Sequence, residues 1–256
     1  CANITFSNCF VTGHRIYKTI GAAGRPVNMG SYDLHANDVV NLHLANCRMH
    51  HICDRTRWGV IATNFCKNIL LEDCVLSRMD THMGVSGTYT IRRCTLGYMG
   101  VNAIGRGELT VEDSELYGRA FLNFRADYGS TWHGNTVIRN CKWTPACGEV
   151  NRPTMIYVRN DGMHDFGYPC SMPRQVRIEK LYVDDSNHPA DYDGMYIFSD
   201  PESPPSGEKR IAEEAERPFP YEKCRAVRVS GLSTATGKKP RLSPNAELNQ
   251  VCRFVQ

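Results

Sequence analysis

Five segments of the chain repeat one order of hydrophobic and polar residues. Each has the order apolar, any residue, apolar, any residue, Asn or Asp, Cys, any residue, apolar. The copies are residues 42–49, 69–76, 89–96, 109–116 and 136–143, in which Arg93 replaces the usual Asn or Asp and Ser114 replaces the cysteine. Apolar residues with a period of two predict half-buried β-strands, because a helix would need a period of 3.6 residues.

The spacing of the copies predicts that these strands stack. The position of Cys47 recurs at Cys74, Cys94, Ser114 and Cys141, at intervals of 27, 20, 20 and 27 residues, and weaker copies occupy residues 4–9, 176–183 and 227–232. A unit of about 20 residues with only short strands cannot bury its apolar face alone. We therefore expect each strand to pair in parallel with its counterpart about 4.8 Å away, so that equivalent side chains lie above one another.

The cysteines and the residues before them are predicted to form a bend. Asn46, Asp73, Asp113 and Asn140 suit a tight turn, because Asn and Asp tolerate a left-handed backbone. The chain has 12 cysteines and no Cys-x-x-Cys pair, which argues against a zinc ribbon or a redox motif. We expect most of them to be free, buried thiols in a cysteine ladder. The even number leaves a disulfide framework as the alternative.

This pattern resembles the right-handed parallel β-helix of the pectate-lyase-like superfamily over about residues 3–200 and 224–256. The resemblance implies an all-β fold, a single-stranded right-handed parallel β-helix (a solenoid) with about 20–27 residues per coil. A leucine-rich repeat is the nearest rival, but the units vary in length and lack its order of leucines. A β-sandwich would not need the recurring cysteine position.

Composition narrows the class of protein. The 256 residues are 41% hydrophobic and 22% charged, as in ordinary globular proteins. The formal charge of +3 is too small to predict nucleic-acid binding. The longest apolar runs are far below the about 18 residues that a membrane span needs. We expect an extracellular or cell-surface protein, although free thiols would also suit a reducing or anaerobic setting.

The chain is predicted to form one domain over residues 1–256, as a fragment of a longer chain. Residues 201–222 are rich in proline and charge and are predicted to be a surface insertion between coils; a lid over a groove is the alternative. Residues 223–256 are expected to form the final coils, with a last strand over residues 249–255.

Further strands are predicted after the bends, and their alignment gives three outward columns of side chains. The first column is His82, Asn102, Asn123, Tyr157 and Tyr196; the second is Gly84, Ile104, Arg125, Arg159 and Phe198; the third is Ser86, Arg106, Asp127, Asp161 and Asp200. This face is more polar and aromatic than a strand requires. We predict that it binds substrate through His82, Asn102, Arg106, Asn123, Tyr128, Trp132, Tyr157 and Asp200.

Four residues of this face are the candidate catalytic groups. Stacking would bring Asp127 and Asp161 about 5 Å apart, where one carboxyl raises the pKa of the other and an acid can work beside a base or nucleophile. Arg125 and Arg159 could bind carboxylates of the substrate. Alternatively, arginine and aspartate columns neutralise each other in a solvated ladder.

The resemblance implies a carbohydrate-active protein, either a glycoside hydrolase or a polysaccharide lyase acting on an acidic polysaccharide. A non-catalytic glycan-binding module, as in adhesins or trimeric tailspikes, is the main alternative, and a structural stalk is the third. The partner would be a polysaccharide rather than a nucleic acid or a membrane. No cofactor is expected; calcium would need a carboxylate cluster that the sequence does not indicate.

Overall fold

The computed structural model describes residues 1–21, 23–30, 32–57, 61–126, 129–148, 153–159, 171–188, 191–201 and 222–256. Its strands are β1 (Ala2–Ser7), β2 (Phe10–Val11), β3 (Tyr17–Ile20), β4 (Pro26–Met29), β5 (Leu34–Asn37), β6 (Val40–Ala45), β7 (Arg48–Met49), β8 (Ile61–Glu72), β9 (Val75–Arg92), β10 (Thr95–Asn102), β11 (Gly105–Glu112), β12 (Glu115–Leu116), β13 (Leu122–Asn123), β14 (Trp132–Trp143), β15 (Thr154–Tyr157), β16 (Gln175–Val183), β17 (Tyr196–Phe198), β18 (Ala226–Thr234) and β19 (Arg253–Val255). The helical segments are the 3₁₀ turn η2 (Pro145–Gly148) and the helix α2 (Ala246–Val251). The predicted all-β class is confirmed.

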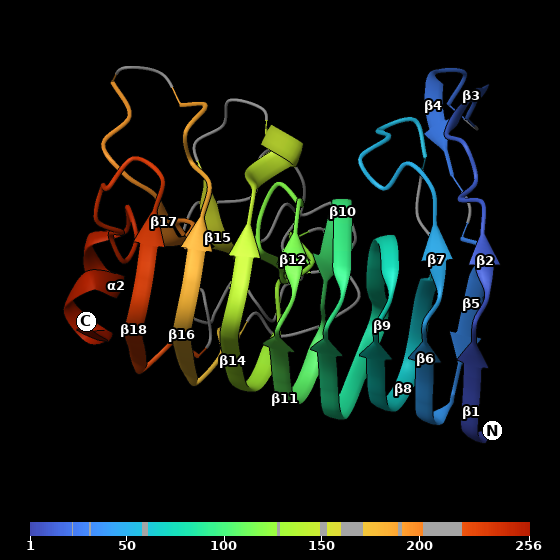
Figure 1. The fold of residues 1–256 in the computed structure, drawn as a ribbon, viewed down its shortest axis with the longest axis horizontal. Coiled ribbons are helices and arrows are strands. Elements are labelled where there is room, and N and C mark those ends of the chain that lie inside the picture. The colour runs from blue at the N-terminus through green and yellow to red at the C-terminus, as the bar shows by residue number, and fades with distance from the viewer. Residues whose placement is uncertain are drawn as a thin grey trace.

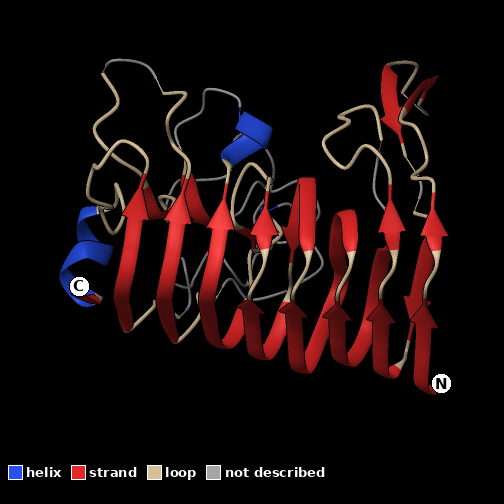
Figure 2. Ribbon diagram, viewed as in Figure 1, coloured by secondary structure: helices blue, strands red, loops and turns tan. Residues whose placement is uncertain are grey.

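Seventeen of the strands belong to one sheet whose turns follow one another along the long axis of the molecule (Figure 1). The two ends of the chain lie at opposite ends of this axis, and the helical segments lie at its periphery (Figure 2). Strands β3 and β4 form a separate antiparallel hairpin that projects at the N-terminal end.

The longest row of strands runs β1, β6, β8, β9, β11, β14, β16, β18 and β19, and every pairing in it is parallel. Equivalent residues are paired from coil to coil, as the spacing predicts. One inward column is Leu44, Leu71, Ile91, Val111, Ile138, Ile178 and Val229. All of these except the partly exposed Val229 are buried, because the period of two directs them into the core.

A second row runs β5, β8, β9, β10, β13, β15 and β17. Its inward column is Ile61, Met79, Val101, Leu122, Ile156 and Phe198, all of them buried. The two rows enclose one hydrophobic core, and β8 and β9 take part in both rows.

The bend before each cysteine position has a left-handed backbone in successive coils. The φ angles lie between 50° and 56° at Asn8, Asn46, Asp73, Arg93, Asp113, Asn140 and Lys180, and Gly231 takes the same place with φ 67°. Asn and Asp are the residues that best tolerate this region, which explains the recurring polar position. Side-chain amides also join neighbouring bends: Asn140 Nδ2 donates to Asp113 Oδ1 at 2.6 Å.

Cysteines follow these bends inside the core. Cys47, Cys74, Cys94 and Cys141 are buried free thiols, and the backbone N–H of Cys94 donates to the Ser114 hydroxyl in the next coil at 3.0 Å. Burial raises the pKa of Cys47 and of Cys141 to about 11, so both thiols stay neutral at pH 7. Nine cysteines in the described ranges are free, whereas Cys53 is disulfide-bonded.

The C-terminal prediction is partly wrong. Residues Ala246–Val251 form α2 rather than the start of a strand, and only Arg253–Val255 pair with β18. The reason is local: the side chain of Asn245 accepts a hydrogen bond from Leu248 N at 2.7 Å and caps the helix, while Leu248 is buried. Most of the predicted insertion, residues 202–221, lies outside the described residues.

The left-handed bend predicts the effect of substitutions at Lys180, whose side chain is exposed. The free energy of unfolding of Lys180→Val should be about 1–2 kcal/mol lower than that of Lys180→Gly, as measured by urea titration. The reason is that a β-branched side chain clashes with the carbonyl in this conformation. The same two substitutions at Tyr182, in the extended part of β16, should give the opposite order. If the Val variant were less stable than the Gly variant at both positions, the role of the bend would be contradicted.

Candidate functional site

The residues that alternate with the inward column of the second row form a mostly polar column, which Ala62 interrupts and in which Ala62 and Asp80 are fully buried. Paired residues place His35, Ala62, Asp80, Asn102, Asn123 and Tyr157 in successive coils. Asn123 Nδ2 donates to Asn102 Oδ1 at 2.7 Å, so the two amides form one hydrogen-bonded unit. Asn102 is buried, whereas Asn123 and Tyr157 are partly exposed.

This column corrects the predicted first column at both ends. The partner of Asn102 in the preceding coil is Asp80, and His82 lies two residues further along β9. Tyr196 pairs with Thr154 and therefore does not follow Tyr157. Register shifts between Thr63 and Asn64, and between Leu96 and Gly100, displace the coils relative to a simple alignment of motifs.

Several other predicted positions point inward. Ile104 and Phe198, from the predicted second column, are fully buried, and Phe198 is part of the core column. Trp132 is also fully buried: its ring stacks on Phe124 with 5.8 Å between centroids, and its indole N–H donates to Asn135 O. The prediction that Trp132 contacts substrate is therefore wrong in this structure, because its ring is not accessible.

The remaining predicted residues are dispersed along the face. Arg106 is exposed and pairs with His133, while Asp200 accepts a hydrogen bond from Asn245 Nδ2 at 2.9 Å. Arg159 is held through its backbone, since its N–H donates to Ser130 Oγ at 2.9 Å. Asp127, Tyr128 and Asp161 lie outside the described residues, so the 5 Å spacing of the two carboxyl groups stays a prediction.

A buried ion cluster lies at Asp80. Arg125 Nη1 donates to both carboxylate oxygens of Asp80 at 2.8 Å, and Arg78 Nη2 donates to Oδ2 at 2.6 Å. The hydroxyl of Tyr32 donates to the same Oδ2 at 2.5 Å. Asp80 is fully buried and the two arginines are almost fully buried, so these charges interact with little screening by solvent.

The cluster determines the protonation states of its members. Burial would raise the pKa of Asp80, but the positive charges of Arg78 and Arg125 outweigh it and hold this pKa below its usual value. Burial, together with the Asp80 carboxylate, raises the pKa of Tyr32. At neutral pH these four side chains are therefore one carboxylate, two guanidinium groups and a neutral phenol.

Arg125 is thus a positioning residue in this structure. The sequence predicted it as an exposed catalytic group, yet it is almost fully buried and both oxygens of Asp80 accept its hydrogen bonds. A guanidinium held in this way cannot accept a proton as a base. Its backbone has a positive φ of 33°, two residues after Asn123 in the chain.

No sequence pattern predicts the contacts of the His133 ring. The ring lies 3.2 Å from Ser171 Oγ through Nε2 and 3.3 Å from Glu222 Oε2 through Nδ1. Only the winding of the chain brings these three residues together, because they are far apart in sequence. Ser171 is fully buried, so a polymeric substrate cannot reach its hydroxyl, and we assign this trio no catalytic role.

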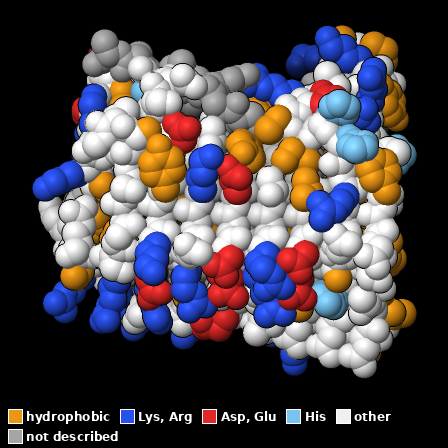
Figure 3. All heavy atoms as spheres, viewed as in Figure 1, with side chains coloured by type: hydrophobic (Ala, Val, Ile, Leu, Met, Phe, Trp, Pro, Cys, Tyr) orange, Lys and Arg blue, Asp and Glu red, His pale blue; other side chains and the backbone are white. Residues whose placement is uncertain are grey.

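The alternative prediction, that the arginine and aspartate columns neutralise each other, stays untested, because Asp127 and Asp161 lie outside the described residues. A ladder of other charged residues lies on the outer face of the long row. The column Glu72, Arg92, Glu112, Arg139 and Glu179 alternates in sign from coil to coil. Arg92 lies 2.8 Å from Glu72, and Arg139 lies 2.5 Å from Glu112. Figure 3 shows these alternating basic and acidic side chains in the lower half of the view.

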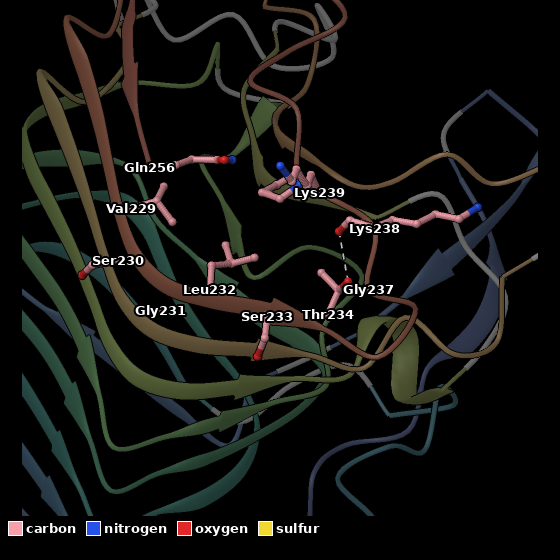
Figure 4. A pocket seen from close by; sticks show the side chains of 11 residues that line it. Val229, Ser230, Gly231, Leu232, Ser233, Thr234, Gly237, Lys238, Lys239 and Gln256 are labelled. Atoms are coloured by element: carbon pink, nitrogen blue, oxygen red, sulfur yellow. Dashed lines mark hydrogen bonds between the residues drawn. The ribbon is translucent and has the colours of Figure 1, made fainter.

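The described residues of the polar column form neither a metal site nor one of the hollows described here. No group of three or more His, Cys, Asp or Glu side chains that could hold a metal occurs among the described residues, so the cofactor prediction stays untested. Two hollows lie instead at the last coil; one of about 460 Å³ is bounded by Leu232, Thr234 and Lys238 (Figure 4). Within the same ranges, none of the helices has the length and apolar character needed to cross a membrane.

Comparison with known proteins gives one partial similarity. No family model matches the chain. Over 121 residues the chain is 28% identical to a capsule KL64-specific depolymerase of Klebsiella phage P510. The similarity covers 43% of this chain and 12% of the phage protein, so the chain spans a small part of that protein's length.

The ion cluster predicts a large effect of Asp80→Asn on stability. Removing the charge of the carboxylate that both buried arginines contact should lower the free energy of unfolding by about 3–5 kcal/mol in urea titrations. The matched control is Glu112→Gln, which removes a carboxylate from the exposed ladder and should cost less than about 1 kcal/mol. Equal losses in the two variants would contradict the cluster's role.

The same cluster predicts a pH dependence. Because the pKa of Asp80 is lower in the folded chain than in the unfolded chain, where it is about 3.9, the ion pair stabilises the fold above about pH 4. This stabilisation is lost as the pH falls through the folded-state pKa. The difference in unfolding free energy between wild type and Asp80→Asn should therefore be constant from pH 5 to 7 and shrink below pH 4. A difference that does not change with pH would contradict this assignment.

Proposed function

We propose that this chain is a right-handed parallel β-helix segment of an extracellular protein that binds and degrades a polysaccharide. The observation that carries this proposal is the similarity to the capsule depolymerase, which covers 121 residues. The in-register parallel pairing of successive turns supports the solenoid architecture. A rigid row of coils suits a long polymer, because it offers an extended surface rather than a closed pocket.

The polar column is the proposed glycan-binding face. Asn123 and Tyr157 are partly exposed and adjacent in the column, and the Asn102–Asn123 hydrogen bond orients the outer amide. Amide and phenol groups both donate and accept hydrogen bonds, as sugar hydroxyls do. The Asp80 cluster supports this face from below by holding Arg125 next to Asn123.

The cleavage chemistry is proposed for Asp127 and Asp161. A hydrolase would use one carboxyl group as acid and the other as base or nucleophile. The Asp80 ion pair argues against Arg125 as the base of a lyase. Arg159 stays a candidate for binding a substrate carboxylate; its backbone N–H donates to Ser130 Oγ.

The proposal is tested by incubating the protein with a panel of purified acidic capsular polysaccharides and following chain length by size-exclusion chromatography. We expect oligosaccharides from at least one member of the panel. Asp127→Asn and Asp161→Asn should each lower the rate by about 100-fold or more, since each removes a proton-transferring group. An unsaturated, ultraviolet-absorbing product end would identify a lyase instead.

Binding is measured separately by affinity electrophoresis in gels that contain the same polysaccharide. Asn123→Ala should weaken retention, whereas Asn135→Ala, which removes an amide from the other row, should leave it unchanged. Retention without any cleavage would replace the enzyme by a glycan-binding module. Absence of both retention and cleavage on the panel would contradict the proposed function.

A further inference from the structure

The charges on the long row are not distributed evenly. In the central coils, acidic and basic side chains alternate and pair, as in Arg92–Glu72, Arg139–Glu112 and Lys142–Glu115. In the last coils, basic side chains follow one another instead. Figure 3 shows this change toward the C-terminal end, where Lys and Arg side chains gather below β16 and β18.

Five exposed arginines make up this region, which we call the arginine surface. Arg177 and Arg228 are partners in the parallel pairing of β16 and β18, so they project from adjacent coils about 4.8 Å apart. Arg174 and Arg225 are likewise adjacent, because Arg225 N donates to Arg174 O, and Arg253 N donates in turn to Arg225 O. Three successive coils thus each contribute arginine side chains to one outer face.

Acidic partners are scarce on this surface. Glu179 lies 3.7 Å from Arg177, but the equivalent residue in the next coil is Ser230. Within the ranges that the structure describes, no carboxylate pairs with Arg174, Arg225, Arg228 or Arg253. Like charges stacked in adjacent coils repel one another, so an anionic ligand would relieve a repulsion that the central coils avoid by alternation.

The surface also has a suitable shape. A hollow of about 680 Å³ lies at its C-terminal side and is bounded by Arg177, Arg228, Arg253 and Ser230, among others. It is lined by side chains of β16, β18 and β19, whereas the polar column belongs to the row of β9, β10, β13 and β15. The two surfaces are therefore formed by different rows of strands.

We propose that the arginine surface is a second glycan-binding site that binds the carboxylate groups of an acidic polysaccharide. Guanidinium groups bind carboxylates with two parallel hydrogen bonds, and the coil-to-coil spacing presents them at regular intervals along the axis. This inference rests on the proposed function for the class of polymer. It adds a second binding site for that polymer, on a different row of strands from the polar column.

A polysaccharide fits better than a nucleic acid. Single-stranded nucleic acids are usually bound through aromatic side chains that stack on bases, and the lining of the hollow contains no aromatic residue. The chain as a whole carries only +3, so the positive charge is local rather than spread along a duplex-sized surface.

The test uses affinity electrophoresis in gels that contain polygalacturonate, with fully methyl-esterified polygalacturonate as the neutral polymer. The triple variant Arg225→Gln/Arg228→Gln/Arg253→Gln should bind polygalacturonate about tenfold or more weakly than wild type, because three ion pairs are lost. The control Lys18→Gln/Arg25→Gln/Lys67→Gln removes the same charge from exposed sites near the N-terminal end and should bind as wild type. Binding should weaken with added salt.

Three outcomes would overturn this inference: equal loss in the two triple variants, equal retention by the esterified polymer, or tighter retention by duplex DNA than by polygalacturonate. Circular dichroism of each variant verifies that it is folded. The proposed function is judged by a different result, cleavage or retention of the capsular panel and its sensitivity to Asn123→Ala. Cleavage of a polysaccharide of the panel, together with unchanged binding of polygalacturonate by the Arg225→Gln/Arg228→Gln/Arg253→Gln variant, would leave the proposed function intact and refute the arginine surface.

Discussion

The structure depends on one constraint, the in-register parallel pairing of each coil with the next. A residue in such a stack meets the residue at the same position of its neighbours, about 4.8 Å away. The side chains at equivalent positions of neighbouring coils must therefore be able to pack or pair with one another. Apolar positions satisfy this condition by stacking, as Ile91 does between Leu71 and Val111. Bend positions satisfy it with side-chain amides that bond from coil to coil, as Asn46 does with Asn8.

Charged positions need a different solution, because identical charges repel when stacked. The central coils alternate Glu72, Arg92, Glu112 and Arg139, so each of these side chains is next to at least one of opposite charge. Asp80 is an exception of another kind, since it is buried and is paired with two arginines at once. Burying such a group is costly unless its partners are well placed. Asp80 is the neighbour of Asn102 in the preceding coil, so this costly buried cluster lies beside the proposed glycan-binding face.

The functional interpretation depends on the positions where stacked side chains carry the same charge. Arg177 and Arg228 stack without alternation, and the proposed role of a polyanionic ligand explains why a chain that neutralises its other columns leaves this one basic. The polar column and the arginine surface would let two parts of one long polymer be bound by two rows of strands. The partial similarity to a capsule depolymerase agrees with a polymer of this kind.

The amino-acid sequence alone was sufficient for the all-β class, the spacing of the central coils and the left-handed bends, because each depends on residues that are close in the chain and recur. It was not sufficient for the longer coils, in which strands far apart in the chain, such as β16 and β18, pair directly. It was not sufficient for the outer face. His82 and Asp80 differ by two positions, and only bulges that shift the register decided which of them lies beside Asn102. Likewise, Trp132 is inside and Arg125 is bound to a carboxylate 45 residues away. These outcomes depend on loop lengths and on contacts between coils. Such contacts join residues far apart in the chain, so a local sequence pattern does not predict them.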